Sequence, residues 1–156
     1  MQTSTSRLSP ARVRLSRTLI VVALLTLSAP AFAADTYKVD GDHAFVVFRV
    51  PHFSTGAVFG RFRTVTGQFT LGKTASDHSV SIEVDAASVY TGNKKRDEHI
   101  KGPDFLNVKQ FPKISFKSSN VIKRGKRHVV TGTLEFHGVS KKVTVPMKQL
   151  GAIKDP

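Results

Sequence analysis

The chain has 156 residues, of which 40% are hydrophobic, and its 24 lysines and arginines against 11 acidic residues give a net charge of +13 at pH 7. This length predicts one domain, and the hydrophobic and aromatic content excludes an intrinsically disordered protein. Cysteine is absent, which excludes disulfides, cysteine-ligated zinc, iron–sulfur clusters, a thiol nucleophile and an acylated N-terminal cysteine.

The first 33 residues have the pattern of a secretory signal peptide. Four arginines precede the apolar run Leu19–Leu27, and the small-residue site Ala31-Phe32-Ala33 follows it. A membrane anchor is the weaker alternative, because an apolar helix needs about 20 residues to span a bilayer. We therefore expect cleavage after Ala33 and export to a bacterial periplasm. The remaining domain, residues 34–156, keeps a net charge of +9, because the leader carries four arginines and no acidic residue.

Alternation of apolar and polar residues dominates the domain and predicts β-strands. The segments with this pattern are residues 80–85, 113–118, 131–137 and 142–148. Residues 44–50 are apolar on both parities except at Arg49, which predicts a strand covered on both faces. Phe62 and Phe69 are seven residues apart, so they share a face of one strand only across a bulge, which we place at Gly67.

Turn-forming residues separate these strands. The basic run Lys123–Arg127 lies between two apolar stretches and predicts a hairpin. Only residues 94–107 favour a helix, which is short because Gly102-Pro103 ends it. Strands with regular turns and no alternating helices predict an all-β protein, either an antiparallel barrel or a sandwich.

Candidate catalytic and metal-binding residues give weak signals. The six histidines do not pair at a spacing that presents two imidazoles to one metal, which favours structural roles. Asp97, Glu98 and His99 invite an acid–base interpretation, but neighbours on a helix point in different directions, and acidic residues are ordinary at a helix start. Known catalytic motifs are absent from the sequence, so we expect no enzyme, metal or cofactor.

Two basic clusters, Lys94–Arg96 and Lys123–Arg127, could meet phosphate groups on nucleic acid, lipid head groups or other polyanions. Single-stranded nucleic acid is bound by basic grooves interleaved with exposed aromatic residues, and this sequence pattern is missing around the second cluster. We therefore expect no nucleic-acid partner.

Five motifs along the chain resemble those of one known family. They are, in order, Tyr37-x-Val39-Asp40-x-x-His43-Ala44-x-Val46-x-Phe48-x-Val50-x-His52, then Gly60-x-Phe62 with Gly67-x-Phe69, then Ser88 through Arg96-Asp97-Glu98-His99-Ile100-Lys101 to Phe105, then Phe111-Pro112-x-Ile114-x-Phe116-x-Ser118, and finally Gly132-x-Leu134-x-x-His137-Gly138-Val139-x-Lys141-x-Val143. The chain is thereby similar to the YceI-like polyisoprenoid-binding proteins, which are secreted bacterial proteins.

The resemblance implies a lipocalin-like antiparallel β-barrel with one short helix. It also implies a non-catalytic periplasmic protein that holds a long isoprenoid lipid, such as a polyprenyl phosphate or a quinone, in an apolar cavity for carriage or sequestration. Family members usually continue beyond the position of Asp155-Pro156, so either the chain is truncated or the barrel is left open at its C-terminal strands. The exposed edges of such a barrel could pair with a second copy to form a homodimer.

Strand parity selects the residues expected to face the ligand, which are Phe48, Val50, Ile82, Val84, Phe116, Leu134, Phe136 and Val145. Lys94, Lys95 and Arg96 are candidate head-group residues, because the family's loop and short helix lie at the end of the barrel, and they could also meet an anionic membrane surface. The alternative function is a structural or stress-response interaction protein. Its core would be filled by its own side chains, and its basic surface would act on anionic lipids or polyanions.

Overall fold

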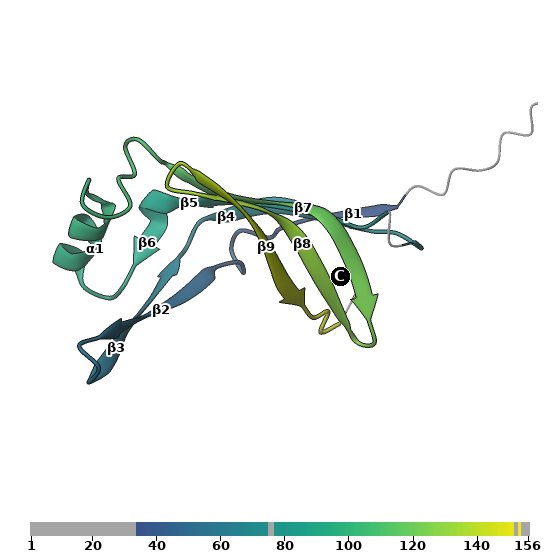
Figure 1. Ribbon diagram of the computed structural model, residues 1–156, viewed down its shortest axis with the longest axis horizontal. Coiled ribbons are helices and arrows are strands. Elements are labelled where there is room, and N and C mark those ends of the chain that lie inside the picture. Colours follow the sequence, from purple (N-terminus) through teal and green to yellow (C-terminus); the bar gives the residue numbers. More distant parts are fainter. Residues whose placement is uncertain (1–33, 75–76, 152, 154–156) are drawn as a thin grey trace, which may run out of the picture. The chain divides into compact units, whose positions relative to one another are not determined.

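The computed structural model describes residues 34–74, 77–151 and 153, so the predicted signal peptide at residues 1–33 lies outside the described residues. The described part is built mainly of strands (Figure 1). In chain order the elements are β1 (Asp35–Lys38), β2 (Val46–His52), β3 (Gly56–Phe62), β4 (Val65–Leu71), β5 (Ser79–Asp85), the 3₁₀ turn η2 (Ala86–Ser88), β6 (Val89–Tyr90), α1 (Lys94–Lys101), β7 (Lys113–Arg124), β8 (Arg127–Phe136) and β9 (Val139–Met147).

The strands form two antiparallel sheets. One has six strands in the order β1-β4-β5-β7-β8-β9, and the other has three in the order β2-β3-β6. The predicted all-β antiparallel class with one short helix is confirmed. Within the described residues, no strand pairing joins the two sheets, so the barrel is open there. Pairing of a free edge with a second copy stays a prediction.

Two tight turns set the register of the last three strands. Gly125-Lys126 joins β7 to β8, and Gly125 adopts φ of 62°, a conformation that glycine reaches without strain. His137-Gly138 joins β8 to β9, with φ of 52° and 74°, as a two-residue hairpin of the type I′ kind requires. The hairpin predicted over residues 123–127 is confirmed.

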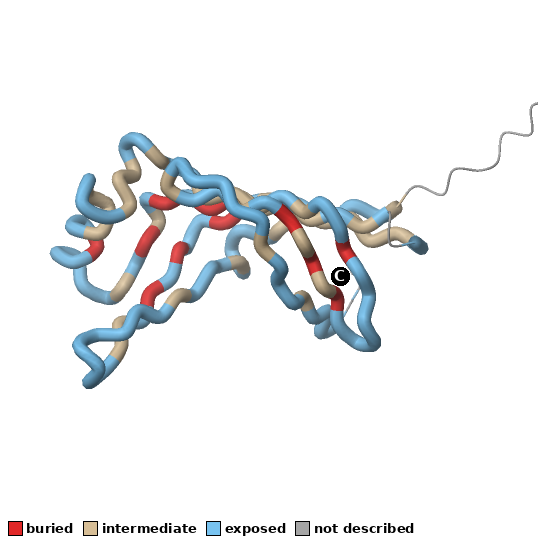
Figure 2. Tube along the Cα trace, in the orientation of Figure 1, coloured by how far each residue is buried: buried red, intermediate tan, exposed pale blue. Residues whose placement is uncertain are grey.

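The prediction that residues 44–50 form a strand covered on both faces is wrong. β2 is an edge strand of the small sheet, and six of its seven residues are exposed, while Phe48 is half-buried (Figure 2). An apolar run in the sequence shows only that both faces of the strand are suited to burial. Whether another layer covers them depends on the rest of the fold, and here nothing in the described residues covers the face that carries Val47.

The bulge predicted at Gly67 is also wrong. Phe62 and Phe69 lie on two separate strands, because the chain breaks after Phe62 and resumes as β4 at Val65. The break is fastened by Ser88, whose hydroxyl accepts hydrogen bonds from the backbone amides of residues 63 and 64 at 3.1 Å each. A strand break changes the parity of the following residues, just as a bulge would.

Gly67 has a different role in β4. It pairs regularly with Ile82 and adopts φ of 144°, and a Cβ added there would collide with the carbonyl oxygen of Ser81. The glycine therefore permits the close approach of β4 and β5. The irregularity in the six-stranded sheet lies instead in β7, between Ser118 and Asn120.

The main core lies where the two sheets and α1 meet. Its buried members come from β3, β4, β5 and β6, and they are Phe62, Val65, Val84 and Val89. Half-buried apolar side chains from β2, α1 and the following loop pack against them. Val121 and Val130, paired across β7 and β8, are the largest fully buried side chains of the described residues. The core is small, so much of the apolar inner face stays accessible.

Candidate functional site

An apolar hollow of about 720 Å³ lies between the three-stranded sheet, α1 and the end of β8. We refer to it as the apolar hollow. Its lining residues are Phe48, Val50, His52, Val58, Phe62, Val89, Arg96, His99, Ile100, Phe105, Leu106 and Phe136. The volume falls within the range of roughly 300–1,000 Å³ that small-molecule sites occupy. Nine of these twelve side chains are hydrocarbon, so the hollow suits an apolar ligand.

Alternate residues of β2 and β3 form the sheet wall of the hollow. Phe48 and Val50 point to the same face because side chains alternate along a strand, and Val50 pairs with Val58 of β3. Phe48 pairs with Gly60, and a Cβ at that glycine would collide with the Phe48 ring. The glycine of the Gly60-x-Phe62 motif therefore makes room for an aromatic ring over the sheet.

The helix α1 and the loop after it form the opposite wall. Asn93 caps α1, its side chain accepting a hydrogen bond from the amide of Arg96, and the helix ends at Gly102. The chain then folds back, and the amide of Leu106 donates to the carbonyl of Ile100 at 2.9 Å. This turn brings the apolar pair Phe105 and Leu106 next to the helix face that lines the hollow.

A buried carboxylate holds this wall in place. Asp97 is 7% exposed, and its Oδ1 accepts hydrogen bonds from the amide and the hydroxyl of Thr91 at 2.9 and 2.6 Å. Arg96 reaches the same threonine, donating from Nε to its hydroxyl at 2.8 Å and from Nη2 to its carbonyl at 2.9 Å. The Thr91 hydroxyl thus both donates and accepts a hydrogen bond, and its amide and carbonyl are also paired. These bonds fix α1 against the end of β6.

The hollow has three polar lining side chains: His52, Arg96 and His99. His99 packs edge-on against the Phe105 ring at 4.9 Å, and its Nε2 lies 3.9 Å from the carboxylate of Asp104. Since Arg96 uses two of its five donors on Thr91, its remaining donors can meet a polar group at the rim. The hollow therefore combines an apolar interior with a small cationic edge.

Four of the residues predicted from sequence line this hollow, namely Phe48, Val50, Phe136 and Arg96. Lys94 and Lys95 are exposed on the first turn of α1 and do not line it. Asp97, predicted as an ordinary acidic residue of the helix start, is buried. Its hydrogen bonds give Asp97 a structural role.

The other predicted ligand residues lie on the inner face of the six-stranded sheet. Ile82, Phe116 and Leu134 form one row across β5, β7 and β8, because each is paired with the next in register. Val84 is buried in the core, whereas Val145 on β9 is exposed. Strand parity thus correctly placed these residues on one face of the six-stranded sheet. Phe136, at the end of β8 on the same face, lines the apolar hollow. Contact of these side chains with a ligand stays a prediction.

Strand parity missed the residues that α1 and its loop contribute. Ile100, Phe105 and Leu106 lie outside any alternating segment, so no periodic signal pointed to them. The available signal was an apolar pair one residue after the helix-ending Gly102-Pro103, where a solvent-exposed loop would be polar.

Comparison with known proteins agrees with this architecture. The YceI-like domain matches residues 37–154. The protein YceI from Salmonella newport is 39% identical over 139 residues, which cover 87% of this chain and 72% of that protein. The chain belongs to the YceI-like family. A UPF0312 protein from Photorhabdus laumondii is 34% identical over 140 residues, covering 88% of this YceI-like chain and 73% of the relative.

Solved structures of two bacterial proteins have the same fold. BcnA from Burkholderia cenocepacia superposes with a TM-score of 0.62 at 29% identity, over 69% of this chain and 70% of that one. The YceI protein of Campylobacter jejuni gives a TM-score of 0.59 at 27% identity, over 76% and 71%. The predicted family and fold are therefore confirmed.

Two features are absent from the described residues of this YceI-like chain. No three histidine, aspartate or glutamate side chains gather there where they could hold a metal ion. Nor is any helix of residues 34–74 and 77–151 long and apolar enough to cross a membrane.

Proposed function

We propose that this YceI-like protein binds a long isoprenoid lipid in the apolar hollow, without catalysis, and carries or sequesters it. The observation that supports this proposal best is the hollow itself, with hydrocarbon walls and Arg96 and His99 at its edge. A tail would be buried among Phe48, Val50 and Phe136, and a polar head would meet the cationic edge. Both ends of an amphipathic lipid thus find suitable surroundings.

Burial of hydrocarbon can account for tight binding. Each CH₂ removed from water contributes about 0.8 kcal/mol, and large ligands realise about −0.3 kcal/mol per heavy atom. A tail of roughly forty carbons would then approach about −12 kcal/mol, a dissociation constant near 1 nM. Chain length is discriminated only weakly, by about 1 kcal/mol per CH₂, so the head group would determine which lipid is bound.

The test is lipid uptake by the full chain, compared between two matched variants. Val50→Asp puts a carboxylate into the hollow, and Val47→Asp puts the same group on the opposite face of β2; the two valines are 52% and 61% exposed. We expect Val50→Asp to weaken binding of a long-chain quinone and a polyprenyl phosphate by about tenfold or more, because an apolar site disfavours charge. Val47→Asp should bind as the unchanged protein does.

Equal binding by the two variants, or no uptake of either lipid by the unchanged protein, would refute lipid binding in the hollow. Extraction of the purified protein followed by mass spectrometry gives an independent result. We expect an isoprenoid in the extract.

Export is the second part of the proposal. Residues 1–33 have the arginine-rich start, apolar run and small-residue site of a signal peptide, which supports action in the periplasm. Cell fractionation should find the protein in the periplasm, with an N-terminus at Ala34. Retention in the cytoplasm, or an intact leader on the exported protein, would contradict this prediction.

An anionic membrane surface is the candidate partner for lipid transfer, supported by an arginine–aromatic cluster on the outer face of the small sheet. The Arg61 guanidinium lies 5.8 Å from the Phe45 ring and 5.7 Å from the Tyr90 ring, and Arg63 lies 4.9 Å from Tyr90. Phe45 and the neighbouring Phe59 are exposed. Aromatic rings and cations together suit a bilayer interface that carries negative charge.

Vesicle co-sedimentation tests this partner. Replacing both Arg61 and Arg63 with glutamine should reduce association with anionic vesicles and leave the weak association with neutral vesicles unchanged. The control replaces Lys117 and Lys142, two exposed lysines on the outer face of the six-stranded sheet, and removes the same charge. Equal losses in the two double variants would show that net charge alone attracts the protein to the vesicles.

A further inference from the structure

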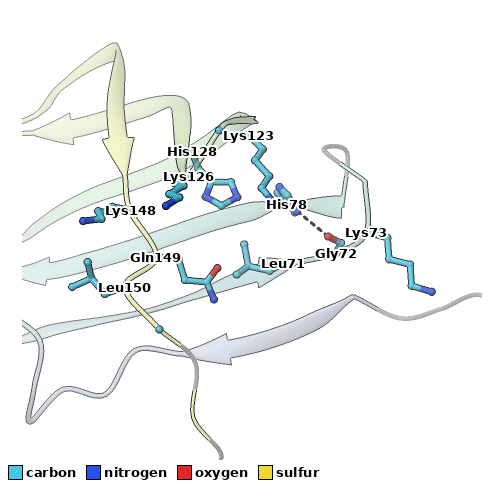
Figure 3. Close-up of a pocket in the computed structure, with 12 residues that line it drawn as sticks. Leu71, Gly72, Lys73, His78, Lys123, Lys126, His128, Lys148, Gln149 and Leu150 are labelled. Atoms are coloured by element: carbon cyan, nitrogen blue, oxygen red, sulfur yellow. Dashed lines mark hydrogen bonds between the residues drawn. The ribbon is translucent and has the colours of Figure 1, made fainter.

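A second hollow, of about 750 Å³, lies at the other end of the six-stranded sheet (Figure 3). We call it the basic pocket. It is formed by the β4–β5 connection, the β7–β8 hairpin and the segment after β9, with lining residues Leu71, Gly72, Lys73, His78, Lys123, Gly125, Lys126, His128, Lys148, Gln149, Leu150 and Gly151. Among the described residues none of these lining side chains is acidic. A hollow with four lysines and two histidines attracts anions.

Two histidines lie side by side in this pocket. The rings of His78 and His128 have centroids 5.6 Å apart and meet edge to face at 74°. His128 is 7% exposed and pairs with Lys123 across the hairpin. Figure 3 shows Lys123 extending toward the two rings, whereas Lys73 points away from them. The pair comes from segments fifty residues apart in the chain, which the sheet brings together.

Each of these histidines has a buried nitrogen without a hydrogen-bond partner among the described residues. His78 Nε2 lies 2.9 Å from the carbonyl oxygen of Gly72, so this nitrogen carries the proton and donates it. Nδ1 of His78 and Nδ1 of His128 are both buried and unpartnered. Buried polar atoms of folded proteins are nearly always paired, so two such atoms in one cationic hollow point to a missing partner.

The chemistry of that partner follows from the surrounding groups. A neutral histidine with a protonated Nε2 offers Nδ1 only as an acceptor, but protonation turns Nδ1 into a charged donor. Two imidazolium rings this close to lysines would repel one another unless an anion compensated them. The Asp77 carboxylate lies next to Gly72 and accepts hydrogen bonds from the amide and hydroxyl of Thr74 at 3.0 and 2.7 Å.

We propose that the basic pocket binds a phosphate-bearing anion, with His78 and His128 taking up protons and donating to its oxygens. Lys123, Lys126 and Lys148 supply additional positive charge from the hairpin and the segment after β9. Phosphate fits this set of groups because it carries two charges near neutral pH and has several acceptor oxygens. Anion binding here does not require lipid in the apolar hollow, because the two hollows have no lining residue in common.

The charged groups around the histidines determine how binding depends on pH. They are Lys73 and Asp77 from the β4–β5 connection, Lys123 and Lys126 from the hairpin, and Lys148 after β9. Histidine is the only one of these side-chain types whose charge ordinarily changes between pH 5 and 8. An anion that binds the protonated histidines should bind more tightly as the pH falls through that range.

The experiment is calorimetric titration of the full chain with inorganic phosphate and pyrophosphate between pH 5.5 and 8. We expect the affinity to fall as the pH rises through the histidine range. His128→Gln should lower the affinity at pH 6 by about tenfold or more, because a charge-assisted hydrogen bond is lost. Lys95→Gln, an exposed lysine on α1 outside the pocket, removes one charge elsewhere and should lower the affinity by no more than twofold.

A measurement on the unchanged protein guards against a variant that fails to fold. In NMR titrations, addition of pyrophosphate should shift the imidazole resonances of His78 and His128, while the resonances of exposed His43 remain unaffected. Pyrophosphate that moves neither resonance, or that binds equally well to His128→Gln, overturns the proposal.

A further arm distinguishes the source of the phosphate. Geranyl pyrophosphate, which has the same head group and a short tail, is titrated beside inorganic pyrophosphate. Equal affinities would assign the pocket to a free anion, and tighter binding of geranyl pyrophosphate that is lost in His128→Gln would assign it to a lipid head group. Either result supports a phosphate site, whereas binding of neither compound contradicts it.

Discussion

The two hollows of this protein have nearly the same volume, about 720 and 750 Å³, and opposite chemistry. Phe136 at the end of β8 lines the apolar hollow, and His128 near its start lines the basic pocket, about 26 Å away at roughly 3.3 Å per residue. One strand therefore contributes to both. Two cavities of similar volume therefore suit different ligands, because the chemistry of their lining side chains determines which molecules can bind.

The largest expected effect concerns the core that supports the apolar hollow. Phe62 on β3 is 8% exposed and belongs to the core cluster, so Phe62→Ala should lower the free energy of unfolding by about 3–5 kcal/mol. Phe59, three residues earlier on the opposite face, is 63% exposed, and Phe59→Ala should cost less than about 1 kcal/mol. Urea unfolding of both variants measures the difference. Similar losses would show that the two faces of β3 are equally packed.

The helix wall of the apolar hollow offers the next test. Asp97→Ala removes the acceptor for the amide and hydroxyl of Thr91, and leaving such groups unpaired costs about 1–3 kcal/mol. Glu98→Ala, one residue along, removes only an exposed ion pair with Lys101 and should change stability by less than about 1 kcal/mol. Chemical denaturation compares the two variants. A smaller loss for Asp97→Ala would remove the basis for its structural role.

A substitution in the basic pocket should affect ligand binding more than stability, in contrast to the substitutions around the apolar hollow. His128 is buried with an unpartnered nitrogen, so replacing it with leucine, a residue of similar size, should change the free energy of unfolding by no more than about 1 kcal/mol. The same variant should lose phosphate binding. A strong loss of stability would mean that His128 supports the fold, and the contrast between the two hollows would then disappear.

The smallest effect is expected outside both hollows, at an exposed pair. His43 Nδ1 lies 2.7 Å from a carboxylate oxygen of Asp40, and this hydrogen bond raises the pKa of His43 and lowers the pKa of Asp40. The pair therefore makes its full contribution to stability between pH 3.8 and 6.5, the ordinary pKa values of aspartate and histidine. Its contribution is lost as the pH rises through the folded pKa of His43, or falls through that of Asp40.

NMR titration of His43 provides the measurement. Asp40→Asn should return the pKa of His43 toward 6.5, with hardly any change in thermal stability, because both side chains are exposed. Asp42→Asn is the matched control, since the Asp42 carboxylate has only a minor effect on the pKa of His43. A His43 pKa that is the same with and without the Asp40 carboxylate would contradict this interpretation.

Local patterns in the sequence predicted much of the fold. Alternation identified β5 and β8, the turn residues identified the β7–β8 hairpin, and Gly102-Pro103 marked the end of α1. Each of these features is decided by neighbours in the chain. Coverage of β2 and the break at residues 63–64 were predicted wrongly, because they depend on which distant segments pack there. The hydrogen bonds that the amides of residues 63 and 64 donate to the Ser88 hydroxyl illustrate this dependence.

The candidate site was predictable only in part, for the same reason. Parity selected Phe48, Val50 and Phe136, which the fold brings to one hollow. It could not select Phe105 and Leu106, whose place depends on a turn after the helix. The pair of His78 and His128 was missed because the sequence search considered histidines close together in the chain, whereas these two meet across the sheet.

Photo-crosslinking with an isoprenoid whose tail carries a reactive group tests the central claim most directly, because it reports which side chains contact the lipid. The account predicts labelling of peptides that contain Phe48 and Val50, Phe105 and Leu106, and Phe136, with little labelling of the Lys123–Arg127 hairpin tip. Labelling confined to the outer face of β2 and β3, or none above the level of the Val50→Asp variant, would contradict it.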